Sequence, residues 1–128
     1  MRTVSFDPQL LRKHLLRHTI ATLPELKQAL GATANLTVFR KLKLLDYLAS
    51  YTHRGRYYSL REIARFDGVG LWSHDAVWFS RYGTLVSTIE SFVSQAPGGY
   101  FADELADALH AEVQDPLQDL ARSGRLRP

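Results

Sequence analysis

Between Leu23 and Leu60 the spacing of apolar residues changes in a fixed order, and this order limits the fold more than any other feature of the chain. Leu23, Leu26 and Leu30 recur at intervals of three and four residues, which predicts a short helix with one apolar face. Gly31 follows the last of them and suits the left-handed conformation that ends many helices. The residues after Gly31, up to Leu60, are therefore expected to form further secondary-structure elements and not to continue this helix.

A second helix is predicted from Asn35 to Tyr47, and a β-hairpin follows it. The apolar stripe of this helix consists of Val38, Leu42 and Leu45. Its other side carries polar and basic residues. In the hairpin segment, from Ala49 to Leu60, β-branched and aromatic residues stand on both sides of Arg54-Gly55, which predicts a turn with a cationic tip.

Upstream, the segment from Pro8 to His18 has the pattern of an amphipathic helix. Asp7 is suited to cap this helix, and Pro8 is suited to its first position. Leu11 and Leu15 lie on one side of it and cations lie on the other. We expect this helix to lead the module and to pack under the two helices that follow.

In this order of elements the chain resembles the winged helix-turn-helix family of DNA-binding domains, over roughly Asp7 to Leu60. The residues that carry the resemblance are the apolar skeleton Leu26, Leu30, Val38, Leu42 and Leu45 and the tip His53-Arg54-Gly55-Arg56. In that family the second helix enters the major groove, and the hairpin, or wing, touches the backbone or minor groove. The resemblance implies a mainly α fold of the α+β class with a small β-hairpin wing, and double-stranded DNA as partner.

The residues expected to contact DNA lie around the start of the second helix and at the hairpin tip. They are Thr33, Asn35, Thr37, Arg40, Lys41, Lys43, His53, Arg54 and Arg56. We expect Asn35, Thr37 and Arg40 to reach base edges, because Arg favours guanine and Asn favours adenine. The remaining Lys and Arg residues would hold phosphates, and one wing arginine would enter the minor groove.

The distribution of charge favours the same partner. Residues 1–60 hold ten Lys and Arg against three Asp and Glu, a balance of +7, whereas residues 61–128 hold six against ten, a balance of −4. The net charge of +3 hides this asymmetry. Clustered cations bind a phosphate backbone because they release its counterions. Arg12, Lys13 and Arg17 extend the basic set beyond the second helix and the tip.

An internal repeat indicates a second, related module at residues 81–128. Glu104-Leu105 and Ala108-Leu109 match the first short helix at an offset of 79 residues. Val113, Leu117 and Leu120 match the apolar stripe of the second helix at an offset of 75, so a turn four residues shorter is expected. We expect a leading helix over Thr84–Gln95, a short strand at Tyr100-Phe101 and a truncated hairpin after Gly124. The fold is thus interpreted as a tandem winged helix-turn-helix.

The second module departs from a DNA reader in its charge. Glu112, Asp115 and Asp119 lie on its second helix, where they would repel phosphates, and Pro116 requires this helix to start near Asp115 or to kink. We therefore assign it to packing or dimerisation, and we expect a homodimer through this C-terminal half. Two-fold pairing would let two DNA half-sites add their contacts.

Residues 61–80 form the least predictable part, a connecting segment rich in glycine and aromatic residues. Phe66, Leu71, Trp72, Trp78 and Phe79 are too apolar for a free tether. We expect the segment to lie along both modules. Burial in the structure is the first interpretation of these aromatics, and an interface with a partner is the second.

No signature of catalysis or of cofactor binding is found in the sequence, so we expect no enzyme activity and no cofactor. Ser73-His74-Asp75 are adjacent and point in different directions, unlike a catalytic triad. His14 and His18 have the spacing of metal ligands, but they lack an acidic or cysteine partner nearby, so no metal is predicted. The chain has no cysteine and no apolar run near the ~20 residues that span a bilayer, so a cytoplasmic protein without membrane contact is expected, nucleoid-associated if bacterial.

The sequence leads to the hypothesis of a sequence-specific factor that binds double-stranded DNA, either as a transcriptional regulator or for a mobile element. The alternative is a docking module in which the basic face meets an acidic protein partner. A third interpretation, RNA binding, requires bases to stack on Tyr51, Tyr57 or Tyr58. Competition by duplex DNA and the salt dependence of binding separate these hypotheses.

Overall fold

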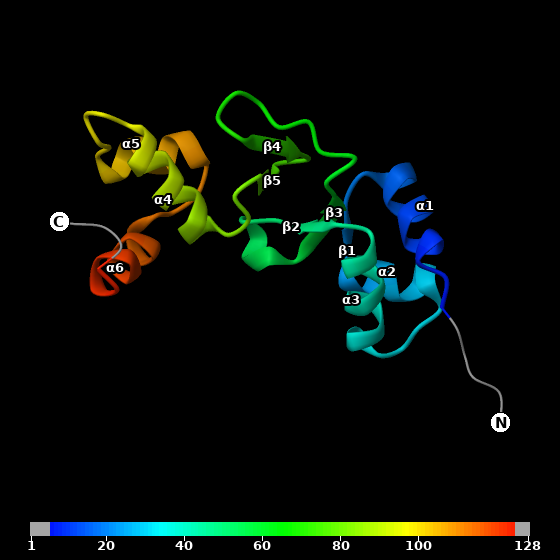
Figure 1. Ribbon diagram of the computed structural model, residues 1–128. Coiled ribbons are helices and arrows are strands. Elements are labelled where there is room, and N and C mark those ends of the chain that lie inside the picture. The colour runs from blue at the N-terminus through cyan, green and yellow to red at the C-terminus, as the bar shows by residue number, and fades with distance from the viewer. Residues whose placement is uncertain (1–5, 125–128) are drawn as a thin grey trace.

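The computed structural model describes residues 6–124 and shows an α+β protein with two small antiparallel sheets (Figure 1). Its elements are α1 (Pro8–His18), β1 (Ala21–Thr22), α2 (Leu23–Leu30), α3 (Asn35–Leu44), β2 (Tyr47–Ala49), the 3₁₀ turn η1 (His53–Gly55), β3 (Tyr57–Leu60), β4 (Leu71–His74), β5 (Val77–Ser80), α4 (Leu85–Gln95), α5 (Ala102–Leu109) and α6 (Gln114–Arg122). Helices α1–α3 lie at one end, the strands lie in the middle, and α4–α6 lie at the other end.

The ends of the first helices are formed by local hydrogen bonds that the sequence predicts in part. The Asp7 carboxylate accepts the backbone N–H of Gln9 at 2.9 Å, which confirms it as the cap of α1. At the start of α2 the Glu25 carboxylate accepts both the N–H and the hydroxyl of Thr22. These bonds lower the pKa of Glu25. Gly31 ends α2 with a left-handed φ of 79°, as predicted.

The first sheet has the strand order β1-β3-β2, with both pairings antiparallel. The predicted hairpin is confirmed, because Tyr47 lies opposite Leu60 and Ala49 lies opposite Tyr58. Strand β1 was not expected. Helix α3 ends at Leu44 and not at the predicted Tyr47, because the left-handed φ of 55° at Asp46 turns the chain into β2.

Three apolar clusters hold the chain together. The first joins α1, α2 and α3 to one face of the sheet through residues that include Leu11, Leu15, Leu26, Val38, Leu42 and Leu60. Tyr58 packs against this cluster, whereas its neighbour Tyr57 packs on the other side of the strand, against Leu48, Val77 and Phe79. This alternation is the one expected for adjacent residues of a strand. The second hairpin, β4–β5, therefore covers the face of the sheet that the helices leave open.

The β4–β5 hairpin gives residues 61–80, which we expected to be a connecting segment along both modules, a regular structure that the sequence did not predict. Leu71 pairs with Ser80 and His74 pairs with Val77, so a two-residue turn, Asp75-Ala76, joins the strands. Both turn residues have a positive φ, 50° and 63°, as a type I′ turn requires. The sequence hid this turn because alanine stands where glycine usually marks it. Of the aromatic residues here, Phe79 is fully buried.

At the far end, α4 confirms the helix predicted over Thr84–Gln95, and the Thr84 hydroxyl accepts the N–H of Ser87 at 3.1 Å. A single offset of 79 residues relates α2 to α5 and the start of α3 to the start of α6. The two inter-helix turns therefore have equal lengths, and the predicted shorter turn was wrong. His110 ends α5 with a φ of 55°, the left-handed conformation that Gly31 adopts at the end of α2.

Helix α6 buries a different set of positions from α3, and this difference caused the error. Val113 precedes the helix and is buried together with Leu120. The apolar residues of the two helices therefore align at an offset of 75, whereas the helix starts align at an offset of 79. Pro116 lies in the first turn, where it removes no intrahelical hydrogen bond. Tyr100 and Phe101 form no strand and are exposed. The hairpin predicted after Gly124 lies outside the described residues.

Tyr51 connects the two ends of the molecule. Its hydroxyl donates to the carbonyl of Leu109 in α5 at 2.7 Å, and its N–H donates to the carbonyl of Trp78 in β5 at 2.9 Å. Its ring belongs to the cluster formed by α4, α5 and α6. Over residues 6–124, no helix is both long enough and apolar enough to cross a bilayer.

Candidate nucleic-acid interface

The outward side of α3 carries two cations and two leucines. The cluster beneath the helix holds Val38 and Leu42, and the helical period therefore turns other side chains toward solvent. The exposed residues of this side are Leu36, Arg40, Lys43 and Leu44. Arg40 and Lys43 were predicted from the sequence, but the two leucines, which are 59% and 70% exposed, were not. They flank Arg40 at intervals of four residues, a spacing that is equally typical of a buried helical stripe.

The remaining predicted residues of this helix are less uniform. Thr33 and Asn35 are exposed, one in the turn and the other at the first position of α3. Ala34 caps the helix without a side-chain hydrogen bond, so the first-turn amides have no side-chain acceptor there. Thr37 and Lys41 are half-buried, on the flank of the exposed side.

At the hairpin tip, residues 50–56, an unusual backbone presents the cations. His53, Arg54 and Gly55 have successive positive φ angles of 54°, 55° and 69°. The Gly55 N–H donates to the Thr52 carbonyl, and the Arg56 N–H donates to the His53 carbonyl, both at 3.1 Å. His53, Arg54 and Arg56 are exposed, and together with Tyr57 they line a shallow hollow. The tip is thus a compact turn with its charges outward.

Strand β5 braces this tip from behind. The Trp78 N–H donates to the Thr52 hydroxyl at 3.0 Å, and the Ser50 hydroxyl donates to the Thr52 carbonyl at 2.7 Å. The His53 and Tyr57 rings make a T-shaped contact with their centroids 5.4 Å apart. The position of the cations therefore depends on the second hairpin, β4–β5, which was not predicted from the sequence.

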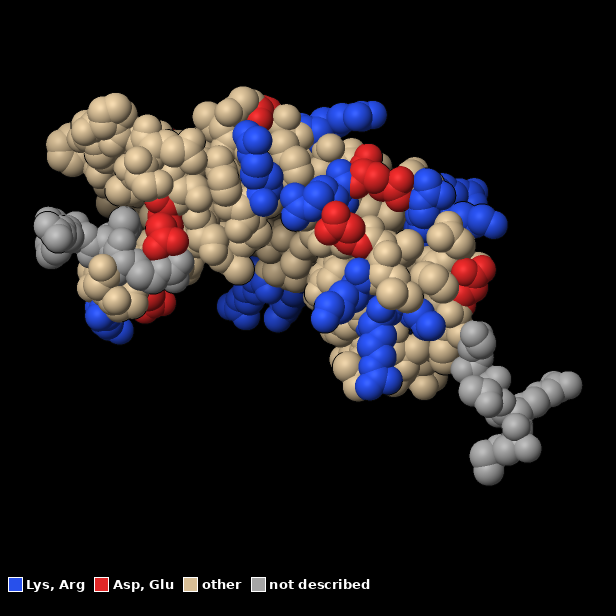
Figure 2. All heavy atoms as spheres, viewed as in Figure 1, with Lys and Arg blue, Asp and Glu red and all other residues tan. Residues whose placement is uncertain are grey.

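The cations of α3 and the hairpin tip are not neutralised by neighbouring acids. Over residues 6–124, the ion pairs join Arg12 to Glu62, Arg61 to Asp46, His74 to Asp75 and Arg122 to Asp119. None of these pairs uses a predicted contact residue. Figure 2 shows Lys and Arg side chains gathered over α3 and below the first hairpin, while the end formed by α4–α6 carries few of them.

On α1 the basic residues divide into paired and unpaired groups. The Arg12 guanidinium lies 2.7 Å from Glu62 and donates two hydrogen bonds to it. This donation lowers the pKa of the Glu62 carboxyl. Arg12 is therefore engaged in the folded chain. Lys13 and Arg17 are exposed and belong to none of the ion pairs in the described part of the chain.

The tyrosines named for RNA stacking are largely covered. Tyr51 is 9% exposed and Tyr57 and Tyr58 are half-buried. Burial raises the pKa of Tyr58, which contacts Tyr47 and the edge of Phe39. Stacking of bases on Tyr51 would require this part of the structure to open.

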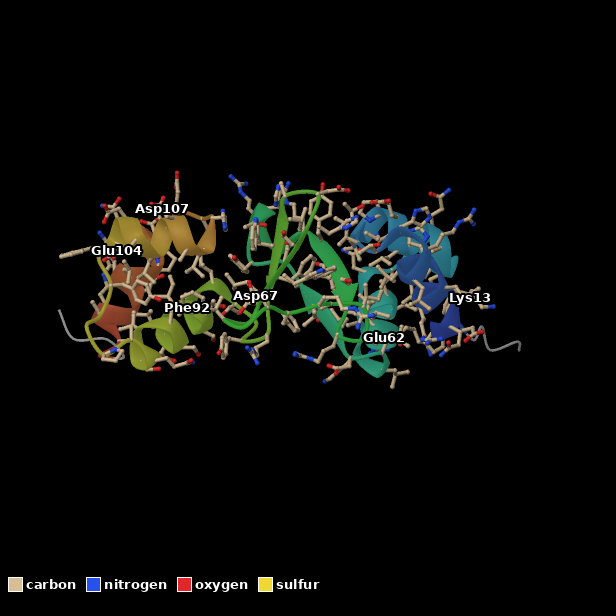
Figure 3. The ribbon with its side chains drawn as sticks, turned by 90° about the horizontal axis from the view of Figure 1, so that it is seen from above. Lys13, Glu62, Asp67, Phe92, Glu104 and Asp107 are labelled. Atoms are coloured by element: carbon tan, nitrogen blue, oxygen red, sulfur yellow. The ribbon has the colours of Figure 1, made fainter. Side chains whose placement is uncertain are left out.

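The opposite end of the molecule is acidic. Figure 3 shows Glu104 and Asp107 on the outer surface of α5, at the far end from Lys13. The other exposed acids of this end are Asp103, Glu112, Asp115 and Asp119. The charge asymmetry of the sequence is therefore also a separation in space, between the α1–α3 end and the α5–α6 end.

The histidines considered as metal ligands or catalytic residues, His14, His18 and His74, are not arranged as such a site in the part of the chain that the structure describes. The rings of His14 and His18 are 4.4 Å apart, and burial lowers the pKa of His14, whose Nε2 atom is buried without a hydrogen-bond partner. Within residues 6–124, no group of three or more His, Asp or Glu side chains is arranged to hold a metal. His74 lies 3.4 Å from Asp75, and strand alternation turns Ser73 to the opposite face.

Comparisons of this chain with models of protein families, with curated proteins and with solved structures found no match.

Proposed function

We propose that residues up to Leu60 form a winged helix-turn-helix module, with α2 and α3 as the helical pair and β2–β3 as the wing. The order α1-β1-α2-α3-β2-β3 and the sheet order β1-β3-β2 support this assignment. We further propose that α4–α6, related to the first module by an offset of 79 residues, form a second copy of the helical part. Its acidic surface assigns this copy to protein contacts.

The first module binds double-stranded DNA in this proposal. The observation that carries it is the clustering of exposed cations on α3 and on the hairpin tip, which belong to no ion pair in the described residues. A phosphate backbone binds such an arrangement through counterion release. The protein then acts as a sequence-specific factor, in transcriptional regulation or for a mobile element.

Within the proposed interface, some residues are assigned to base edges and others to phosphates. Arg40 lies in the middle of the outward side of α3 and is assigned to base edges, with Asn35 and Thr37 beside it. Lys43, Arg54 and Arg56 are assigned to phosphates. The leucines at positions 36 and 44 flank Arg40, where they would meet thymine methyl groups.

Selection of bound duplexes from a random DNA pool, at about physiological salt, tests the function directly. Enrichment of one sequence supports a specific factor, and an inverted repeat would give the spacing of half-sites. Absence of duplex binding would overturn the proposal.

The role of the tip is tested by the double variant Arg54→Gln plus Arg56→Gln. Loss of two phosphate contacts should reduce the slope of log affinity against log salt by about 1.8, because each contact contributes about 0.9. The matched control is Arg65→Gln plus Arg81→Gln, which removes the same charge from exposed sites outside the interface. Equal slopes for the two double variants would remove the tip from the interface.

The exposed leucines of α3 favour one alternative function, docking of a protein partner. Exposed leucines such as Leu36 and Leu44 contribute nothing to a surface that contacts only phosphates. Apolar residues around a central arginine are typical of protein interfaces. Replacement by Leu36→Ser plus Leu44→Ser distinguishes the functions. A docking function predicts loss of the protein partner, whereas affinity for duplexes of random sequence, which depends on phosphate contacts, should change little and only the selected sequence should lose its thymine contacts.

A further inference from the structure

A groove between α5 and α6 has an apolar floor and a charged rim. It has a volume of about 640 Å³. Ala106, Val113 and Leu117 contribute apolar surface, and the exposed Asp103 and Glu112 supply carboxylates. Such a groove suits a segment that presents apolar groups beside cations.

The exposed face of α1 has the complementary chemistry. Leu10 and Leu16 are 43% and 49% exposed, and the helical period places Lys13 and Arg17 between them. Helix α1 has 11 residues and α6 has 9, so at about 1.5 Å per residue the two helices have similar lengths. Figure 3 shows Lys13 at the end of the molecule opposite the acidic surface of α5. The two surfaces therefore cannot meet within one molecule.

We propose that the α5–α6 groove of one molecule binds the α1 face of a second molecule, head to tail. Symmetric pairing of two α5–α6 ends, the two-fold homodimer expected from the sequence, would place carboxylates against carboxylates, which is unfavourable, so the head-to-tail contact replaces that expectation. Head-to-tail pairing instead joins Lys13 and Arg17 to the carboxylates of Asp103 and Glu112. The leucines of α1 then cover the apolar floor of the groove.

This mode of assembly has a geometric consequence. A head-to-tail pair keeps one unused groove and one unused α1 face, so the contact repeats until a ring closes or an open chain of molecules forms. The contact uses neither α3 nor the hairpin tip. It therefore leaves α3 and the hairpin tip accessible to DNA and occupies only Lys13 and Arg17 of the wider basic set.

Sedimentation of the full chain at rising protein concentration tests the assembly. We expect species larger than a dimer at about 50 mM salt, and their dissociation at about 500 mM, because salt screens exposed charge pairs. Two variants each remove one side of the contact: Lys13→Gln plus Arg17→Gln in α1, and Asp103→Asn plus Glu112→Gln in the groove. Each alone should weaken association by about tenfold or more. Arg54→Gln plus Arg56→Gln is the charge-matched control and should associate like the parent.

Mixing the two variants distinguishes a head-to-tail contact from a symmetric one. The mixture contains one unaltered pairing, the intact groove of the α1 variant with the intact α1 face of the groove variant. We expect a dimer of one molecule of each kind that grows no further. In a symmetric contact between α5–α6 ends, the α1 variant would associate alone as well as the parent does.

Three results would overturn the proposal: a parent that stays monomeric at every concentration, an α1 variant that associates like the parent, or a mixture that forms no mixed dimer. Circular dichroism and thermal unfolding verify that each variant is folded. If either variant of the charged residues unfolds, Leu10→Ser plus Leu16→Ser tests the same face through its exposed apolar groups, and retained association would again count against the contact.

Discussion

Removal of one hydroxyl, by Tyr51→Phe, should measure how strongly the two ends of the molecule are coupled. The Tyr51 hydroxyl donates a buried hydrogen bond of 2.7 Å to the Leu109 carbonyl at the end of α5. Phenylalanine keeps the ring and its packing in the α4–α6 cluster. The substitution therefore isolates the hydrogen bond from the apolar contacts.

The expected loss follows from what the substitution leaves behind. A hydrogen bond contributes about 1 kcal/mol net, but a buried carbonyl that loses its donor costs about 1 to 3 kcal/mol. Because Leu109 is fully buried, we expect the second figure to apply. The free energy of unfolding should fall by about 1 to 3 kcal/mol, and Tm should fall by roughly 3 to 5 °C for each kcal/mol in a chain of this size.

Urea denaturation at neutral pH, followed by tryptophan fluorescence, measures this loss. The control is Tyr47→Phe, since Tyr47 is half-buried and its hydroxyl makes no hydrogen bond among those in residues 6–124. Equal stabilities of the two variants would refute the reasoning, because the hydroxyl would then contribute nothing through Leu109.

The pH dependence of stability supplies a second check on the same group. Burial raises the pKa of Tyr51 above its ordinary value, so folding favours the protonated phenol. The resulting stability is complete below the unfolded pKa of about 10 and is lost as the pH rises further. The difference between parent and Tyr51→Phe should therefore shrink above about pH 10. A constant difference across that range would contradict this account.

Three further predictions follow from the packing and the backbone. Leu42→Ala, at a fully buried position of α3, should cost about 2 to 5 kcal/mol in urea denaturation; a cost below that of exposed Leu44→Ala would contradict the core assignment. Ala76→Gly should stabilise the protein by about 0.5 to 1 kcal/mol, because glycine relieves the positive φ of 63° in the type I′ turn, and a lower Tm would exclude this turn. The lowered pKa of His14 means that stability falls as the pH drops below about 6.5, where the unfolded chain takes up the proton first. His14→Gln should reduce this acid-dependent loss between about pH 7 and 5, and an unchanged loss in the variant would contradict this account.

The local elements were determined by sequence patterns alone. The capped helix Pro8–His18, the short helix ending at Gly31 and the strands around Arg54-Gly55 each depend on neighbouring residues, whose spacing and dihedral preferences act over a few positions. The same holds for α4. Helix ends that depend on one left-handed residue, such as Asp46, were less predictable because aspartate adopts that conformation only in context.

For the candidate interface, the sequence identified the cations but not their setting. Arg40, Arg54 and Arg56 were named correctly as exposed residues, since cations rarely leave water. The exposed leucines of α3 were missed, because an apolar residue within a helix is ordinarily assigned to the core. Which leucines face solvent depends on where the other helices pack.

By itself, the sequence determined the order of the helices, the first hairpin, the repeat and the opposite charges of the two halves, because these follow from local spacing and composition. Only the tertiary structure decided that β4–β5 covers the sheet, that Tyr51 joins the tip to α5, and that the acidic groove and the basic α1 face lie at opposite ends. Such contacts join residues far apart in the chain, and their partners are selected by packing and buried hydrogen bonds that no local pattern records.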